Sequence, residues 1–474
     1  MAKALTPDIC VIGAGPGGIA LATGAAAYGV KVVLVDNGAT GDQNPNRRAL
    51  AVSALIAAAK QAQAVRGDRE FGIAEVEPEI DFKAVMARAR EVAADAAPAF
   101  SPERLATLGV TVINAQARFT GRRRLAAGDT EIRARRFVLA TGSTPVEPAI
   151  PGLNEIGCLT ADTVFELGRR PGHLVIIGGE ASGLELAQAF RRLGSQVTVI
   201  EASTVLADED PEMASVVARR LRAEGVTIRE GVKVTGVERR GKTSVRVLIE
   251  TGTGAGEVDG SHLLVAVGRA PDIGTLDLKK ARVALKGDAV DVSAMLRTTN
   301  RRIYAIGDVA GASPSTQMET YQAALVLKAL LFRLPAKDRA IVPRTIHTDP
   351  ELARAGLTEA QARRRHGRLT ILRWPYAEND RARAERRQEG HIKLVASRRG
   401  EILGVTIAGA NASELIGIWA LALSKGLSLK DMASSIPPHP TMGEIGKNAA
   451  ITYFAKRARR PLVRGMVRLL QLFG

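Results

Sequence analysis

The segment DICVIGAGPGGIALATGAAAYGVKVVLVD, residues 8–36, decides the fold of the N-terminal part of the chain. Its pattern predicts a short apolar strand, a glycine-rich turn, a helix of small residues and a second apolar strand that ends at Asp36. A strand, a helix and a strand in this order form a βαβ unit, which indicates an α/β protein with a parallel sheet.

The glycines of this segment have the spacing of a dinucleotide-binding turn. Gly13 permits the tight turn, Gly15 lets the backbone approach a pyrophosphate, and Gly18 lets the helix pack closely on the strand. A carboxylate at the end of the second strand can accept hydrogen bonds from a ribose. The alternative, a glycine-rich loop without a ligand, does not account for the strand, helix and acid together. The predicted site comprises Gly13, Gly15, Pro16, Gly18, Asp36 and Asn37.

A second βαβ pattern begins near residue 170, in HLVIIGGEASGLELAQAFRRLGSQVTVIE, residues 173–201. Gly178 and Gly183 hold the first and third glycine positions, but Glu180 stands where the second glycine is expected, and a carboxylate there repels phosphate unless it swings outward. Glu201 at the strand end favours NADH over NADPH, because a carboxylate repels a 2′-phosphate. The alternative is a degenerate unit that no longer binds a nucleotide.

Length and composition limit the class of protein. The chain has 474 residues, a formal charge of +17 and only two cysteines. Two or three domains are expected at this length, and a disulfide-stapled secreted scaffold is excluded. The N-terminus lacks a signal-peptide pattern and no stretch has the apolar length of a spanning helix, so we expect a cytoplasmic protein. No metal site is predicted.

The positive charge is concentrated in the last third of the chain. Residues 336–474 hold 25 Lys and Arg against 12 Asp and Glu, and residues 445–474 hold seven basic and no acidic residues. The segment 456–474 predicts a basic amphipathic helix, with Pro461 at a helix start. Such a helix can lie on an anionic membrane or pack on a dimer partner, and both interpretations stay open. Nucleic-acid binding is disfavoured, because only 4% of the residues are aromatic.

Further motifs follow in a fixed order along nearly the whole chain: ATGSTPVEPAIPG (140–152), VGRAP (267–271), YAIGDVAG (304–311), TDPELARAGLTEAQA (348–362) and HPTMGE (439–444). With the two glycine fingerprints, they make the sequence resemble the FAD-dependent pyridine nucleotide-disulfide oxidoreductases, near dihydrolipoamide dehydrogenases and mercuric reductase-like proteins. The resemblance implies two Rossmann-like domains, for FAD and NAD(P), and a C-terminal α+β dimerisation domain. The implied boundaries are 1–155 with 270–335 for FAD, 156–269 for NAD(P), 336–455 for the interface domain and 456–474 for the terminal helix.

The same resemblance implies the roles of individual residues. FAD would be bound by the first unit and NAD(P)H by the second. In the implied homodimer, His439 would reach the partner subunit's flavin and be oriented by Glu444. Beyond the fingerprint residues above, the implied cofactor-binding residues are Thr141, Gly142, Ser143, Gly268, Arg269, Gly307 and Asp308, with Asp308 at the ribityl chain.

One departure from the family matters for the chemistry. The family carries two cysteines after the first βαβ unit, and a gapless register places Asn44 and Ala49 at these positions and Ser53 at a following lysine. The actual cysteines, Cys10 and Cys158, lie elsewhere and are interpreted as buried structural thiols. Thiol–disulfide exchange needs a thiolate, so the dithiol activities of the family are not expected.

The sequence therefore predicts an FAD-dependent oxidoreductase that passes electrons from NADH, or less favourably NADPH, to a non-thiol small-molecule acceptor such as a quinone or oxygen. His439 with Glu444 is the candidate proton donor, against the alternative of a packing residue. Arg47 and Arg48 either attract an anionic acceptor or are solvated arginines. The rival hypothesis is a catalytically impaired FAD-binding scaffold or a membrane-docked partner protein.

Overall fold

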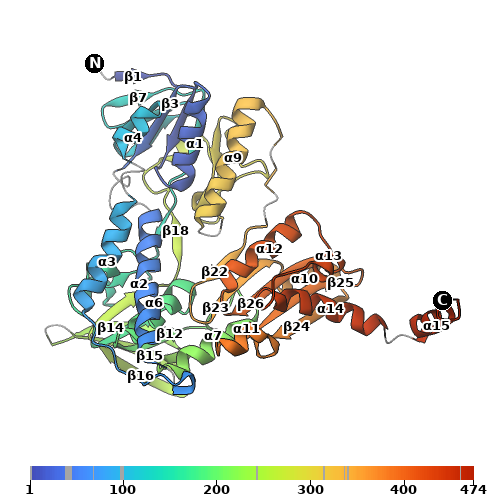
Figure 1. Ribbon diagram of the computed structural model, residues 1–474. Coiled ribbons are helices and arrows are strands. Elements are labelled where there is room, and N and C mark those ends of the chain that lie inside the picture. The colour runs from blue at the N-terminus through green and yellow to red at the C-terminus, as the bar shows by residue number, and fades with distance from the viewer. Residues whose placement is uncertain are drawn as a thin grey trace. The chain divides into compact units, whose positions relative to one another are not determined.

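The computed structural model describes residues 3–37, 45–67, 69–96, 101–241, 244–312, 315–335, 337–338, 341–458 and 461–473 (Figure 1). The chain divides into two compact units, which are described separately. The first unit comprises Met1–Ala149, Gly157–Arg170 and Leu264–Arg339. The second comprises Ile150–Ile156, Pro171–Leu263 and Ala340–Gly474.

A five-stranded parallel sheet forms the centre of the first unit, in the order β21-β8-β2-β3-β4. The helices α1 (Pro16–Ala27) and α9 (Thr316–Phe332) lie side by side (Figure 1) and pack with this sheet in one apolar core. The predicted strand, helix and strand of the opening segment are thus confirmed. The strands are β2 (Ile9–Ile12), β3 (Val32–Asp36), β4 (Val110–Asn114), β8 (Arg136–Leu139) and β21 (Ile303–Ala305).

Smaller elements complete the first unit. The alanine-rich helices α2 (Pro45–Val65) and α3 (Phe82–Asp95) pack on each other. Phe119 and Phe137 join the central sheet to a second sheet through an apolar core. That four-stranded sheet has the order β1 (Lys3–Leu5), β7 (Thr130–Ile132), β6 (Arg124–Ala127) and β5 (Ala117–Gly121). The short strands β9 (Ser143–Pro145) and β18 (Arg269–Pro271) pair with each other.

The second unit begins with the second predicted nucleotide fold. Strands β11 (His173–Ile177), β12 (Gln196–Glu201) and β13 (Thr227–Glu230) are parallel. The connecting helices are α6 (Ala181–Arg192) and α7 (Pro211–Ala223). A separate sheet follows, in which β15 lies between two neighbouring strands. The three antiparallel strands are β14 (Lys233–Arg240), β15 (Ser244–Thr251) and β16 (Gly254–Gly260).

The C-terminal part of the second unit is an antiparallel sheet in the order β22-β23-β26-β25-β24. Its strands are β22 (Arg344–Ile346), β23 (Glu351–Gly356), β24 (Leu369–Pro375), β25 (His391–Ser397) and β26 (Ile402–Gly409). The helices α12 (Ala412–Ser424), α13 (Leu429–Ser434) and α14 (Glu444–Ala458) contribute to the core of this sheet, where Tyr376 and Trp419 are buried. The short α13 lies between the two longer helices in the sequence.

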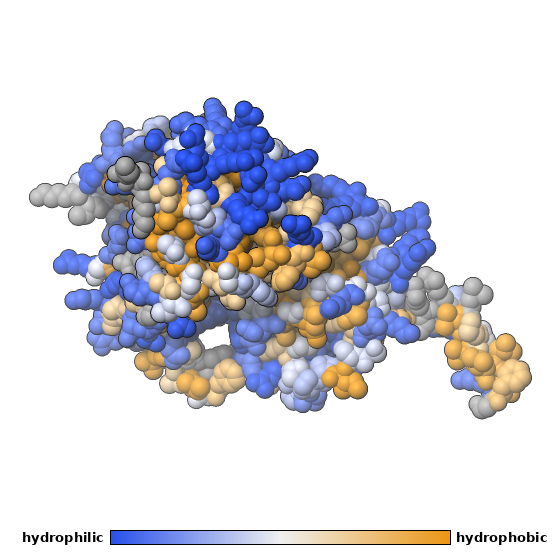
Figure 2. Space-filling model, turned by 90° about the horizontal axis from the view of Figure 1, so that it is seen from above, coloured by the Kyte–Doolittle hydropathy of each residue, from blue (hydrophilic) through white to orange (hydrophobic). Residues whose placement is uncertain are grey.

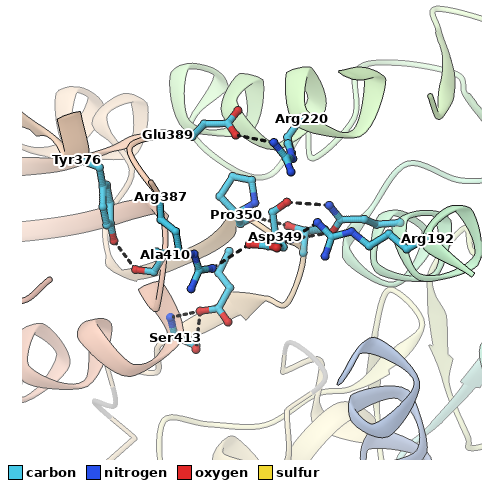
Figure 3. Close-up of polar contacts among 12 residues, drawn as sticks. Arg192, Arg220, Asp349, Pro350, Tyr376, Arg387, Glu389, Ala410 and Ser413 are labelled. Atoms are coloured by element: carbon cyan, nitrogen blue, oxygen red, sulfur yellow. Dashed lines mark hydrogen bonds and ion pairs between the residues drawn. The ribbon is translucent and has the colours of Figure 1, made fainter. Parts of the chain in front are cut away.

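Buried charges connect the two parts of the second unit. Arg192 on α6, with a side chain only 2% exposed, contacts Glu224 at 2.6 Å and Asp349 at 3.1 Å. Figure 3 shows Arg192 and Arg387 both directed at Asp349, and the Arg387 contact is 2.9 Å long. Because unpairing a buried charge costs about 3–5 kcal/mol, these contacts hold the second nucleotide fold and the antiparallel sheet in one arrangement.

The C-terminal helix is shorter than predicted. Residues 456–458 belong to α14, and the separate helix α15 begins at Pro461 and ends at Leu470. Apolar side chains on α15 and just after it are exposed, among them Met466, Leu470 and Phe473. Figure 2 shows this hydrophobic surface on the C-terminal segment. Within the described residues, no helix is both long and apolar enough to cross a bilayer.

Candidate cofactor site

A cavity of about 850 Å³ opens in the first unit, beside the carboxyl ends of β2, β3 and β8. This edge of a parallel sheet is where open α/β folds bind their ligands, and the volume suits a large cofactor. The predicted residues that line the cavity are Gly13, Gly15, Asp36, Asn37, Thr141, Gly142, Ser143 and Arg269.

The glycine turn is built as its spacing requires. Gly13 has a φ of +105°, and a Cβ on it would lie 2.2 Å from the carbonyl oxygen of Ala140. A Cβ on Gly18 would lie 2.0 Å from the carbonyl oxygen of Gly13. The N-cap residue Gly15 provides no side chain to cap α1, which has Pro16 in its first turn. The first N–H groups of α1, of which Gly17 N donates to the Glu319 carboxylate, lie at the turn as at an anion-binding helix N-terminus.

The hydrogen bonds of Asp308 also indicate whether the site fits FAD. Its Oδ2 accepts a hydrogen bond from the Ser143 hydroxyl at 2.5 Å. Its Oδ1 is buried and has no hydrogen-bond partner among the described residues, which is costly unless a ligand donates to it. A ribityl hydroxyl would satisfy this oxygen. Gly307, with a φ of +71°, precedes it and donates its N–H to Gln322. The residues present thus fit FAD.

Two arginines share one carboxylate in the cavity. Arg48 contacts Asp162 at 2.8 Å, and Arg269 contacts the same oxygen at 3.1 Å. Arg269 also donates to the Ser143 hydroxyl at 2.9 Å. Burial and the neighbouring Arg269 lower the pKa of Arg48. Arg48 is therefore a partly buried cation of the cavity and not a solvated arginine, while the side chain of Arg47 lies outside the described residues.

The cysteines do not take part in the cavity. Cys10 lies in β2 and is fully buried, and burial strongly raises the pKa of its thiol. Cys158 is only partly buried, contrary to the expectation, and burial followed by Glu147 raises its pKa as well. A raised thiol pKa disfavours the nucleophilic thiolate. Of the vacated positions, Asn44 lies outside the described residues, while Ala49 and Ser53 are exposed on α2.

Two acidic residues of the second nucleotide fold, Glu180 and Glu201, interact electrostatically. Glu201 at the end of β12 accepts hydrogen bonds from Gly179 N at 2.8 Å and Ser203 N at 2.9 Å. Glu180 is the N-cap residue of α6 without capping it. Burial, Asp208 and Glu201 raise the pKa of Glu180, while Arg344 and the Ala207 N–H oppose this shift.

The two predicted glycines of this fold lie in its turn and at the start of α6. Gly178 has a φ of +110°, and Gly183 is buried in α6. Gly268 belongs to the first unit, has a φ of +110°, and a Cβ on it would have no atom of the described residues within 4 Å. Glu185 on α6 accepts the N–H of His347 at 2.7 Å.

The predicted histidine–carboxylate pair is present in the second unit. His439 Nδ1 lies 3.1 Å from Glu444 Oε1, and the His439 side chain is 65% exposed. The Thr441 N–H, followed by His439, lowers the pKa of Glu444. The carboxylate is thus held ionised, and it can orient the imidazole while the other ring nitrogen stays accessible.

Many residues that line the cavity were not predicted, among them two acidic residues that contact the predicted ones. Asp162, which holds both arginines, and Glu319 on α9 line it together with the motif residues. Neither belongs to a local motif, so the sequence offers no direct signal for them.

The fold and cavity define a dinucleotide-binding α/β protein with two nucleotide folds and a C-terminal antiparallel sheet. The chain belongs to the pyridine nucleotide-disulphide oxidoreductase family, which residues 7–326 match, and residues 342–450 match the dimerisation domain of that family. The resemblance noted in the sequence is therefore confirmed. FAD and pyridine nucleotide binding, flavin-dependent oxidoreductase chemistry and a homodimer are supported by this membership.

Individual relatives are similar over almost their full length. The chain is 31% identical to a dihydrolipoyl dehydrogenase of Geobacillus stearothermophilus, covering 94% of this chain and 96% of the relative. It is 32% identical to a mercuric reductase of Streptomyces lividans, with coverages of 95% and 97%. The solved Cu(II) complex of the HOCl-induced flavoprotein disulfide reductase RclA from Escherichia coli matches with a TM-score of 0.82 and 27% identity, over 92% and 98% of the two chains.

Proposed function

We propose that the protein oxidises NADH, or less favourably NADPH, and transfers the electrons to a non-thiol acceptor such as a quinone, oxygen or another small oxidant. The observation that carries the proposal is the lining of the cavity, which in the described part of the chain contains arginines and carboxylates but no cysteine. When bound, FAD would supply the two-electron step between nicotinamide and acceptor.

The chain's own residues have distinct tasks in this proposal. The turn at Gly13 and Gly18 seats the cofactor, and the Asp308 Oδ1, which has no hydrogen-bond partner in the described part of the chain, anchors it. Arg48 provides positive charge for an anionic acceptor, with Asp162 holding its guanidinium in place. His439, oriented by Glu444, supplies a proton to the reduced acceptor across the homodimer.

The test is anaerobic titration with NADH, followed by reoxidation with a panel of acceptors. We expect the flavin band to bleach, and quinone or oxygen to restore it at least about tenfold faster than lipoamide or oxidised glutathione, because no low-pKa thiol is available. The double variant Cys10→Ser, Cys158→Ser serves as the control and should keep the quinone rate. Disulfide turnover that matches quinone turnover and disappears in this variant would refute the proposal.

A scaffold without dehydrogenase activity is the second candidate, and Glu180 favours it. A carboxylate at the N-cap of α6 opposes the pyrophosphate of a pyridine nucleotide. Failure of both NADH and NADPH to bleach the bound flavin would support this candidate.

The amphipathic α15 is proposed to attach the protein to an anionic membrane surface. Arg464 and Arg468 are exposed beside the apolar residues of this helix, a pattern that suits anionic lipid. Co-sedimentation with vesicles containing phosphatidylglycerol should fall at least about fivefold when residues 461–474 are deleted. Neutral phosphatidylcholine vesicles are the control. Equal sedimentation of both proteins would leave packing on the dimer partner as the better explanation.

A further inference from the structure

Glu319 places a carboxylate inside the turn that should receive a phosphate. Its Oε2 accepts a hydrogen bond from Gly17 N at 3.3 Å and lies 3.5 Å from the position of a Cβ on Gly15. A Cβ on Gly307 would lie 2.6 Å from the Glu319 Cγ. The missing side chains of Gly17 and Gly307 thus leave the space that Glu319 fills at the N-terminus of α1.

The charges around this carboxylate come from three neighbouring elements. Asp308 faces it from the turn Gly307–Ala310, Arg48 from α2, and the Gly17 N–H from α1. On its own helix, the nearby Gln322 is neutral and binds the Gly307 N–H. Burial and Asp308 raise the pKa of Glu319 to about 7, against the opposing effects of Gly17 and Arg48. Both protonation states are therefore populated near neutral pH.

We propose that Glu319 competes with the FAD pyrophosphate for the N-terminus of α1, so that FAD binds with uptake of a proton by this side chain. The same N–H groups cannot bind two unscreened anions at close range without a large repulsion. A protonated Glu319 removes the repulsion and can donate its O–H to a phosphate oxygen. The proton comes from solvent, and no bond other than this O–H is formed or broken.

The consequence is a pH-dependent retention of FAD. Above the pKa of Glu319 the carboxylate is ionised, so each binding event requires protonation and the apparent affinity falls as the pH rises. Below that pKa the side chain is already neutral and the affinity is constant. This inference rests on the proposed binding of FAD by the first unit. It identifies Glu319 as a side chain of the same unit that competes with the FAD pyrophosphate.

The test uses the apoprotein, obtained by removing FAD, and measures FAD affinity by quenching of flavin fluorescence. Between about pH 6 and about pH 8.5, the dissociation constant should rise by about 10- to 30-fold in the natural protein and stay within about twofold in Glu319→Gln. Calorimetry in two buffers of different ionisation enthalpy should detect uptake of about half a proton per FAD at about pH 7, and almost none in the variant.

Glu91→Gln is the matched control, because Glu91 is exposed on α3 and pairs only with the surface residue Arg88 among the contacts described. It should retain the natural pH dependence. The same pH dependence in Glu319→Gln as in the natural protein, or no proton uptake by the natural protein, would overturn the role of Glu319. Absence of FAD binding by every protein at every pH would instead overturn the proposed function.

Discussion

Replacing Gly18 with alanine should abolish stable FAD binding. The new Cβ would lie 2.0 Å from the carbonyl oxygen of Gly13, so the glycine turn and the start of α1 must separate. Overpacking against backbone costs about 3 kcal/mol. A displacement of about 1 Å at the phosphate-binding N–H groups is expected to weaken FAD binding by at least about 100-fold.

The measurement compares flavin content after purification and FAD affinity of the apoproteins, with urea unfolding to follow stability. Gly168→Ala is the matched control, since a Cβ at this exposed glycine of the same unit would have none of the described atoms within 4 Å. The control should bind FAD normally. Full flavin content together with unchanged unfolding of Gly18→Ala would show that the turn does not hold the cofactor as assigned.

The parts of the fold that the sequence predicted are those set by local rules. Gly13 and Gly18 act through contacts inside one turn, and alternating or continuous apolar residues mark β2, β3, β11 and β12. The strands β14 and β16 escaped prediction because glycine and charged residues dominate them, and pairing with β15 on both sides decides their conformation. Local preference is a weak guide for such strands.

The long-range contacts inside the cavity could not be predicted from the sequence. Glu319 is 302 residues from Gly17, and its helix looks like any amphipathic or buried helix in sequence. Asp162 likewise meets Arg48 from a distant segment. No periodicity or motif encodes such encounters, because they depend on how the elements pack. The two cysteines differ for the same reason: Cys10 is buried because it lies in the strand β2, whereas Cys158 lies in a loop and is only partly buried.

Replacing Glu180 with glycine should raise the affinity for NADH. A carboxylate about 4 Å from a phosphate is repelled by roughly 1–4 kcal/mol at effective dielectric constants between about 80 and 20. We therefore expect an increase of about 10- to 100-fold in Glu180→Gly, read from the NADH dependence of flavin reduction in anaerobic stopped-flow experiments. Little change would indicate that Glu180 swings clear of the nucleotide.

The pH dependence of NADH affinity and the variant Glu180→Gln distinguish the effect of the charge of Glu180 from the effect of its size. Because burial, Asp208 and Glu201 raise its pKa, Glu180 takes up a proton at a higher pH than an ordinary glutamate. Protonation removes the repulsion, so the NADH affinity of the natural protein should increase as the pH falls, while that of Glu180→Gln should be higher and independent of pH. Asp208→Asn, a change at an exposed neighbour, is the control and should alter affinity less than about threefold. If nicotinamide reduces the flavin only in Glu180→Gly and Glu180→Gln, the natural protein is the scaffold and not the dehydrogenase, because its own side chain then keeps the nucleotide out.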